Sequence, residues 1–146
     1  MITRQDTGPL TAADFAGDWR LARVLTDRLG AMSGTFTGTA RFTADGSDAL
    51  AYHESGQLTL RAGAVLQAER DYRWVWTATN VTVFFADGAP FHDFRPTGMG
   101  TGTPHLCGAD LYTVTYDFRA WPRWQAVWEV RGPKKNYRSV SDYTPA

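Results

Sequence analysis

Residues 81–91 read Val-Thr-Val-Phe-Phe-Ala-Asp-Gly-Ala-Pro-Phe. Residues typical of β-strands flank the Asp87-Gly88 pair, and glycine readily adopts the positive φ that a tight hairpin turn requires. This is the strongest hairpin pattern in the chain. It predicts two antiparallel strands joined by a turn.

The same alternation of apolar and polar residues, with a period of two, continues on both sides of this hairpin. Gly38 interrupts one alternating run and indicates a sharp bend or a close backbone approach, as the corners of a barrel require. The pattern predicts nine or ten short strands, near residues 19–25, 34–43, 50–54, 58–60, 65–72, 74–76, 81–85, 110–118, 123–131 and 135–143.

A helical pattern is expected only near the N-terminus. Thr11-Ala-Ala-Asp14 resembles a capping box, and Phe15 and Gly17 follow it, so we expect one short helical turn. Without crossover helices the strands must pair antiparallel, and one sheet of this length must curl. The predicted fold class is therefore all-β, a single antiparallel meander β-barrel.

The length of 146 residues fits one domain, and no linker or internal repeat divides it. We expect a flexible N-terminal segment over residues 1–10 and a single barrel domain over residues 11–146. A chain of this size buries enough surface to fold without disulfides or a metal.

The composition excludes several classes of partner. Fifteen basic and fifteen acidic residues cancel, whereas nucleic-acid binders usually carry a basic excess. The single cysteine cannot form an internal disulfide, which favours a reducing compartment. No apolar run has the length of a signal peptide core or a membrane span. We therefore expect a cytoplasmic monomer or weak homodimer that binds neither nucleic acid nor membrane.

Gly17-Asp18-Trp19, placed before the first strand, resembles the G-x-W motif of the lipocalin and calycin superfamily. The resemblance implies that the tryptophan closes the barrel floor and that an arginine from the last strand packs across it. Arg138 is the matching candidate and Arg131 the second. The long helix that usually follows the last lipocalin strand is missing, which implies a minimal relative.

A second resemblance covers about residues 15–143. It rests on Phe85-Ala-Asp-Gly-Ala-Pro-Phe-His-Asp93, His105-Leu-Cys-Gly-Ala-Asp-Leu-Tyr112, Trp128 and Gly132-Pro-Lys-Lys-Asn-Tyr137. These runs resemble a family of uncharacterised bacterial and fungal lipocalin-like domains of unknown function. The resemblance implies the fold and leaves the function open.

Several polar side chains are candidates for a site inside the barrel. His92 could face a cavity as an acid, base or ligand contact, or it could simply bond to Asp93 or a backbone carbonyl. Asp110, Tyr112 and Tyr116 share one strand face, where they could fix a ligand by hydrogen bonds or belong to the core. Trp128, on the next strand, is expected in the barrel wall.

Two further groups lie near predicted turns. His105 and Cys107 are two residues apart, so on a strand they would point to the same side and could supply two metal ligands or a Cys-His pair. No CxxC or HxxxH spacing supports a metal site, so we expect no metal and no cofactor. Lys135 follows the turn at Gly132 and could meet an anionic group at the barrel mouth, or it could be solvated.

The sequence contains no complete catalytic motif. The first hypothesis is an intracellular barrel that binds a small organic metabolite through His92, His105, Asp110, Tyr112, Tyr116, Trp128, Lys135 and Tyr137. The alternatives are an isomerase, cyclase or hydrolase that uses His92 or His105 as acid/base with Asp110, and a haem- or metal-binding barrel with a histidine ligand. We expect His92, Tyr112, Tyr116 and Trp128 to converge on one internal pocket, with Asp110 or His105 near its rim. An interior packed solid by aromatic rings would argue against that pocket.

Overall fold

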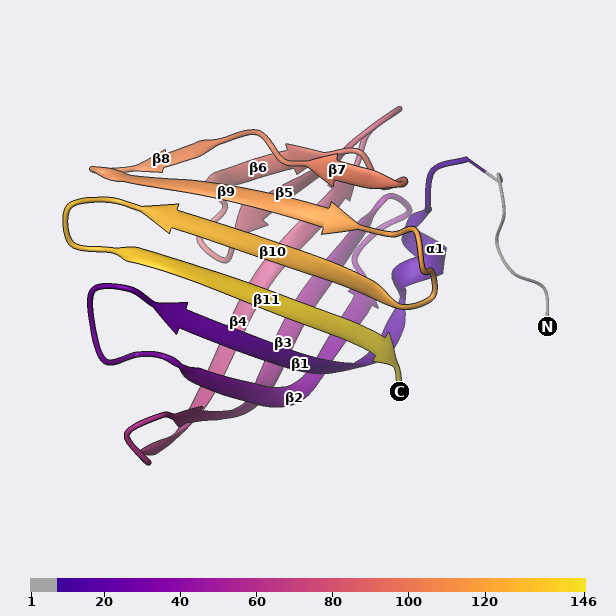
Figure 1. The fold of residues 1–146 in the computed structure, drawn as a ribbon. Helices are drawn as coiled ribbons and strands as arrows, with labels where there is room; N and C mark the ends of the chain where they lie inside the picture. Colours follow the sequence, from indigo (N-terminus) through magenta and orange to yellow (C-terminus); the bar gives the residue numbers. More distant parts are fainter. Residues whose placement is uncertain (1–7) are drawn as a thin grey trace.

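The computed structural model describes residues 8–146, and eleven strands within them form one antiparallel sheet that curls into a nearly closed barrel (Figure 1). The elements in chain order are α1 (Ala12–Phe15), β1 (Gly17–Asp27), β2 (Gly34–Ala44), β3 (Ala49–Leu60), β4 (Val65–Trp76), β5 (Val81–Phe85), β6 (Pro90–Phe94), β7 (Met99–Thr101), β8 (His105–Cys107), β9 (Asp110–Asp117), β10 (Trp124–Arg131) and β11 (Asn136–Pro145). The all-β antiparallel barrel and the N-terminal helical turn are confirmed.

The order of strands in the sheet is β6-β5-β4-β3-β2-β1-β11-β10-β9-β7, with β8 also paired to β9. The first and last strands lie side by side, with Trp19 opposite Pro145 and Leu25 opposite Ser139. The division into strands differs from the sequence prediction. β3 and β4 are each continuous, and the structure adds two short strands, β7 and β8, between the predicted hairpin and the strand predicted near residues 110–118.

The two edges of the sheet, β6 and β7, meet at a seam formed by residues 90–94 and 99–103. Two bonds cross it: the Thr103 amide donates to the Asp93 carbonyl at 2.9 Å, and the Asp93 amide donates to the Thr103 hydroxyl at 3.0 Å. No strand ladder connects β6 with β7 in the part of the chain described. The barrel is therefore closed here more weakly than elsewhere.

One end of the barrel is sealed by α1, whose Phe15 side chain is fully buried. The Thr11 amide donates to the Asp14 carboxylate at 2.7 Å, as the capping-box pattern predicts. The indole of Trp19 donates to the Phe15 carbonyl at 2.8 Å and thereby satisfies one of the last carbonyls of the turn. We call this the closed end. The opposite end, which carries the β1–β2 and β10–β11 turns (Figure 1), is the open end.

The close approach predicted at Gly38 is confirmed. Gly38 lies opposite Gly56 in the β2–β3 ladder. A β-carbon on Gly38 would fall onto the backbone of Ser55 and Gly56. The two glycines therefore let β2 and β3 approach more closely than residues with side chains would allow.

The predicted contact between Trp19 and Arg138 is wrong. Trp19 is buried, but Arg138 lies opposite Thr26, seven residues further along β1, and bonds to Glu129 at 3.2 Å on the outer face. Arg131 is exposed. Successive side chains of a strand point to opposite faces. Ser139 and Tyr143 are buried on the inner face of β11, so Arg138, which precedes Ser139, points outward. Trp121, at 5.4 Å between ring centroids, packs on Trp19 instead.

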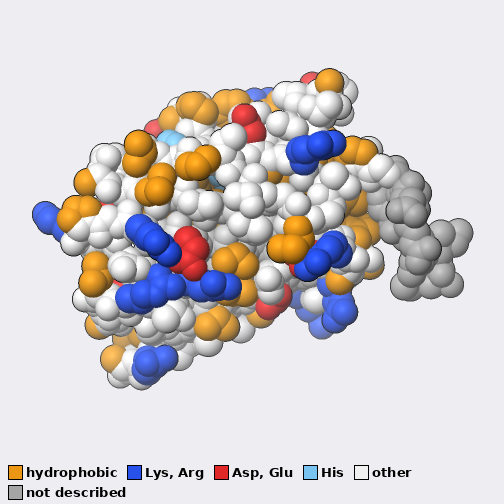
Figure 2. All heavy atoms as spheres, turned by 45° about the horizontal axis from the view of Figure 1, so that its top comes forward, with side chains coloured by type: hydrophobic (Ala, Val, Ile, Leu, Met, Phe, Trp, Pro, Cys, Tyr) orange, Lys and Arg blue, Asp and Glu red, His pale blue; other side chains and the backbone are white. Residues whose placement is uncertain are grey.

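The outer surface carries charges of both signs. Figure 2 shows one face on which basic side chains lie beside acidic ones, with hydrophobic side chains scattered between them. On the outside of the barrel Glu129 contacts both Arg28, at 3.4 Å, and Arg138. Such exposed pairs contribute little to stability.

The predicted flexible segment, residues 1–10, falls mostly outside the described residues. Leu10, which the structure describes, is buried, and its amide donates to the Pro96 carbonyl at 2.8 Å. The bounds of the predicted domain stay a prediction. Within residues 8–146, no helix is long and apolar enough to span a membrane.

Candidate functional site

Aromatic side chains fill the closed half of the barrel. Phe15 lies at the centre of this cluster. Its ring centroid lies within 6.5 Å of those of Trp19, Phe42, Trp74, Trp76, Phe118, Trp121 and Trp124. Because these rings pack against one another in tilted and edge-to-face arrangements, this half of the barrel is a packed core.

Two cavities lie between this core and the open end. The inner cavity, of about 30 Å³, is lined by residues that include Tyr52, His92 and Tyr116. The outer cavity, of about 60 Å³, is lined by residues that include Arg70 and Tyr137. Since a water occupies about 10–15 Å³ on this measure, the inner cavity has room for about two or three waters and the outer one for about four to six.

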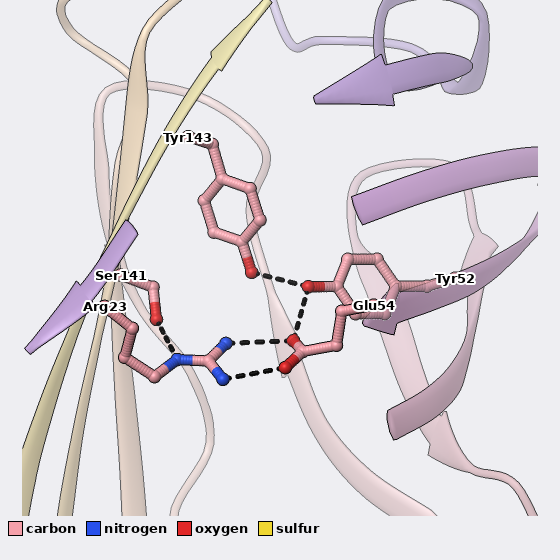
Figure 3. A network of polar contacts seen from close by, with 5 residues as sticks. All are labelled: Arg23, Tyr52, Glu54, Ser141 and Tyr143. Carbon is pink, nitrogen blue, oxygen red and sulfur yellow. Dashed lines mark hydrogen bonds and ion pairs between the residues drawn. The ribbon is translucent and has the colours of Figure 1, made fainter. Parts of the chain in front are cut away.

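A charged pair separates the two cavities and lines both of them. Arg23 on β1 binds Glu54 on β3 through two bonds of 2.7 and 2.9 Å (Figure 3). In the ladders Arg23 lies opposite Phe36 and Glu54 opposite Ala40, so the pair crosses β2 over the intervening Gly38.

Three hydroxyl groups complete the polar network (Figure 3). Arg23 Nε donates to Ser141 Oγ at 2.6 Å. The Tyr52 hydroxyl donates to Glu54 at 2.7 Å and lies 2.7 Å from the Tyr143 hydroxyl. Every member of this chain of contacts is thereby satisfied, as a buried polar network requires.

The protonation states of the residues in this network depend on their contacts with one another. Burial alone would raise the pKa of Glu54, but the hydrogen bonds and positive charge of Arg23 outweigh burial and hold it below its ordinary value. Burial raises the pKa values of Tyr52 and Tyr143. At neutral pH the network therefore holds one guanidinium, one carboxylate and two protonated phenols.

His92 lies on the far side of the inner cavity from this pair. Its Nε2 atom is 2.9 Å from the Tyr116 hydroxyl, and both side chains are buried. Burial, and secondly the charge of nearby His105, lowers the pKa of His92 to about 3. Nδ1 of His92 and Nε1 of Trp124 are buried without a hydrogen-bond partner among the described residues. Both residues line the inner cavity, so these are polar contacts that it offers to a water or a small polar group.

The outer cavity has apolar walls and a cation at its entrance. Arg70 reaches from β4 across the opening, with its guanidinium 5.7 Å from the ring centroid of Trp128 on β10. Phe36 on β2 and Leu58 on β3 form part of its wall. Burial raises the pKa of Tyr137 to about 12, so its hydroxyl is protonated at neutral pH.

The rim of the open end holds several of the other predicted residues. Lys135 Nζ donates to the Tyr112 hydroxyl at 3.3 Å and lies 3.8 Å from an Asp110 oxygen. His105 lies opposite Tyr112 in the β8–β9 ladder. Cys107, the neighbour of Asp110 in that ladder, is exposed.

The structure thus distributes the predicted site residues over three levels. His92, Tyr116 and Trp128 line the inner cavity, Trp128 and Tyr137 line the outer one, and His105, Asp110, Tyr112 and Lys135 lie at the rim. Tyr112 packs on Trp128 with 6.4 Å between ring centroids instead of lining the inner cavity.

The predicted chemistry of these residues is not assembled as an acid/base pair. His92 bonds to Tyr116, whereas Asp110 pairs with Lys135. Among residues 8–146, no three His, Cys, Asp or Glu side chains group to hold a metal ion. The roles of the eight predicted ligand contacts therefore stay predictions.

Three charged residues that line the two cavities, Arg23, Glu54 and Arg70, are absent from the predicted site. The alternation of residues could have indicated two of them. Arg23 shares a strand face with the apolar Trp19 and Leu21, and Glu54 shares a strand face with Leu50. A charge in phase with apolar residues points inward, where it needs a partner.

The model of a family of unknown function, DUF6314, matches residues 15–145. No curated protein matches the chain. A solved protein of unknown function from Nostoc punctiforme, of the DUF3598 family, superposes with a TM-score of 0.60 at 13% identity over 93% of this chain and 48% of that one. The chain thus spans about half the length of that protein, and the likeness supports the barrel fold.

Two redesigned β-barrels are more distantly similar. One, mFAP1, was solved bound to DFHBI, with a TM-score of 0.46 and 12% identity over 92% of this chain and 98% of that one. The other, b11L5F_LGL, has a TM-score of 0.47 and 10% identity over 93% and 95%.

Proposed function

Since the chain belongs to the DUF6314 family, whose function is unknown, we propose from its interior alone that it binds a small organic molecule at the open end of the barrel. The observation that carries the proposal is the outer cavity. Apolar and aromatic walls with a few convergent polar groups are the usual make-up of a small-molecule site. The outer cavity, bounded by Phe36, Leu58 and Trp128 with Arg70 and Tyr137 beside them, has this composition.

The size of the cavity limits the ligand. At about 60 Å³ it is far smaller than sites for drug-sized molecules. The ligand is therefore about the size of a single ring, or a larger molecule that inserts one such group. The aromatic core fills the closed end, to which we therefore assign a structural role.

Binding is favoured over acid/base catalysis in the interior. With a pKa of about 3, His92 does not take up a proton near neutral pH. A general acid or base works best with a pKa near the working pH. We assign His92 and Tyr116 to the polar lining of the inner cavity.

The remaining predictions belong to the same proposal. We propose a lipocalin-like binding protein of the cytoplasm, a monomer or weak homodimer, with residues 11–146 as its single domain. The exposed Cys107 thiol supports a reducing compartment, since it is the only cysteine in the chain.

The proposal is tested by thermal unfolding of the purified protein against a panel of small aromatic acids, amides and alcohols. A ligand present at 100 times its dissociation constant stabilises the folded state by about 2.7 kcal/mol, which raises the melting temperature by several degrees. We expect Trp128→Ala, at the outer cavity, to abolish the shift. Trp121→Ala, which removes an equally half-buried indole at the closed end, should keep it. The proposal is overturned if no compound stabilises the protein, or if Trp128→Ala responds as the wild type does.

A further inference from the structure

The two cavities carry an unbalanced positive charge. The charged side chains that line them are Arg23, Glu54 and Arg70. Arg23 and Glu54 neutralise one another through their paired bonds. His92 is neutral because burial lowers its pKa to about 3. One guanidinium, that of Arg70, is in excess: its positive charge helps to lower the pKa of Glu54, but that carboxylate is already paired with Arg23.

Arg70 has no carboxylate within 4 Å among the described residues. Glu54, its partner across the β3–β4 ladder, is already bound by Arg23 and Tyr52. An open groove on the outer side of Arg70 also touches Asp71 and Asp87. Asp71 is 2.7 Å from His53, and Asp87 accepts a bond from the Ala89 amide at 2.9 Å. The acidic groups around Arg70 are thus bound elsewhere.

Contacts from the opposite wall hold Arg70 at the entrance of the outer cavity. Its guanidinium lies 5.7 Å from the ring centroid of Trp128, which projects from β10 on the other side of the opening. Contact with an aromatic face orients a guanidinium and keeps its in-plane N–H groups available as donors. One donor of Arg70 is directed to the Tyr72 hydroxyl, and the others remain for a ligand. These donors match the geometry of a carboxylate, which can accept two of them at once.

Building on the proposed function, we infer that the ligand of the outer cavity is a small aromatic or otherwise planar carboxylate, with its carboxylate on Arg70 and its ring in the apolar cavity. The ring contacts Phe36, Leu58 and Trp128, the walls that the cavity supplies. The carboxylate supplies the negative charge that this interior lacks. The selectivity resides in Arg70, a residue on the entrance side of the cavity and apart from the buried Arg23–Glu54 pair.

The test compares benzoate with benzamide, its neutral counterpart of nearly the same shape. Binding is followed by NMR titration, with the Trp128 indole signal as the local reporter. We expect benzoate to bind the wild-type protein about tenfold more tightly or better, because a hydrogen bond to a charged group is stronger than a neutral one. We also expect Arg70→Gln to remove this advantage, so that the variant binds benzoate and benzamide with similar affinity.

The matched control is Arg73→Gln, on the same strand. It removes the same charge, but Arg73 lies on the outer face, where it binds Asp45 at 2.9 Å. This variant should retain the preference for benzoate, which separates a local contact from the effect of net charge. Both arginines are exposed, so neither substitution should unfold the protein.

The outcomes separate this inference from the proposed function. If benzamide binds the wild type as tightly as benzoate, or if Arg70→Gln keeps the preference, the inference is overturned and the proposed function stands. If neither probe binds the wild type at millimolar concentration, the inference is overturned, whereas the proposed function is decided by the wider panel of compounds described above. If Arg73→Gln loses the preference as well, the preference for benzoate comes from the net charge of the protein and not from Arg70, and the inference is overturned.

Discussion

At the scale of single residues, the interior depends on which charged groups have found partners. Glu54 is 3% exposed, yet Arg23, Tyr52 and the crossing over Gly38 keep it ionised. Its lowered pKa means that its contribution to stability is complete above the ordinary value of 4.5 and is lost as the pH falls through the lowered one. His92 is also buried, but it carries no charge because its ring stays neutral.

The first prediction concerns His92. Because its pKa falls from 6.5 to about 3 on folding, the unfolded chain binds a proton between these values that the folded protein does not. The free energy of unfolding should therefore decrease as the pH is lowered from about 6.5 to about 4.5, by about 2–3 kcal/mol from this group. His92→Gln, which can still bond to Tyr116, should remove most of this slope in urea unfolding measured across the range.

The control for this prediction is His53→Gln. His53 is exposed on the outer face and contacts Asp71, so its removal should leave the slope attributed to His92 in place. Parallel pH profiles for the wild type and His92→Gln would show that His92 takes up its proton in the folded state, contrary to the buried neutral ring described above.

At the scale of the elements, the period-two pattern predicted the strands well because each strand has one buried face. The Asp87-Gly88 hairpin, the helical turn at α1 and the bend at Gly38 followed from local chemistry that acts within a few residues. The breaks predicted inside β3 and β4 were wrong because Gly56 pairs with Gly38 in the β2–β3 ladder and Arg73 lies on the outer face, so neither residue interrupts its strand. β7 and β8 were missed because three-residue ladders depend on their partner β9, which a local pattern does not contain.

The site was predicted less well than the strands for a related reason. The alternation of residues indicates which side chains of a strand share a face, but it does not indicate which strands lie close together in the barrel. Tyr116 and His92 come together from strands 24 residues apart, and the Arg23–Glu54 pair forms across an intervening strand. The arginine assigned to Trp19 by resemblance failed because its parity on β11 is outward.

The second prediction tests how the closed end is held. Trp19→Ala should lower the free energy of unfolding by about 3–5 kcal/mol, because it removes a buried indole and its bond to the Phe15 carbonyl. Arg138→Ala should cost less than about 0.5 kcal/mol, since Arg138 is half exposed on the outer face. Chemical denaturation of both variants checks the pair. A loss at Arg138 as large as that at Trp19 would contradict the parity of β11.

At the scale of the whole molecule, one sheet forms nearly the entire wall, and its stability is uneven around the circumference. Long ladders join β1 to β4, and β1 also pairs with β11 over nine positions. The seam between β6 and β7 relies on isolated bonds such as that from Thr103 to Asp93. Opening of the barrel should therefore begin there.

The third prediction follows from this unevenness. In native-state hydrogen exchange, amides of residues 91–94 and 99–103 should exchange at least about tenfold faster than those in the β2–β3 ladder, because few hydrogen bonds must break to expose them. Mass spectrometry of peptides from the two regions measures the difference. Equal protection of the seam and the β2–β3 ladder would mean that the barrel opens only by unfolding as a whole.

The placement of the tryptophans gives the protein an optical property. Five of the six indoles form a connected group at the closed end, from Trp76 through Trp74, Trp124 and Trp19 to Trp121. Trp128 projects into both cavities instead. Light absorbed by the five is shared among neighbouring indoles, of which Trp19, Trp74 and Trp124 are buried, whereas the emission of Trp128 responds to what lies beside it. The difference between the fluorescence spectra of the wild type and Trp128→Phe therefore isolates a built-in reporter at the entrance, one that signals occupancy without any added dye.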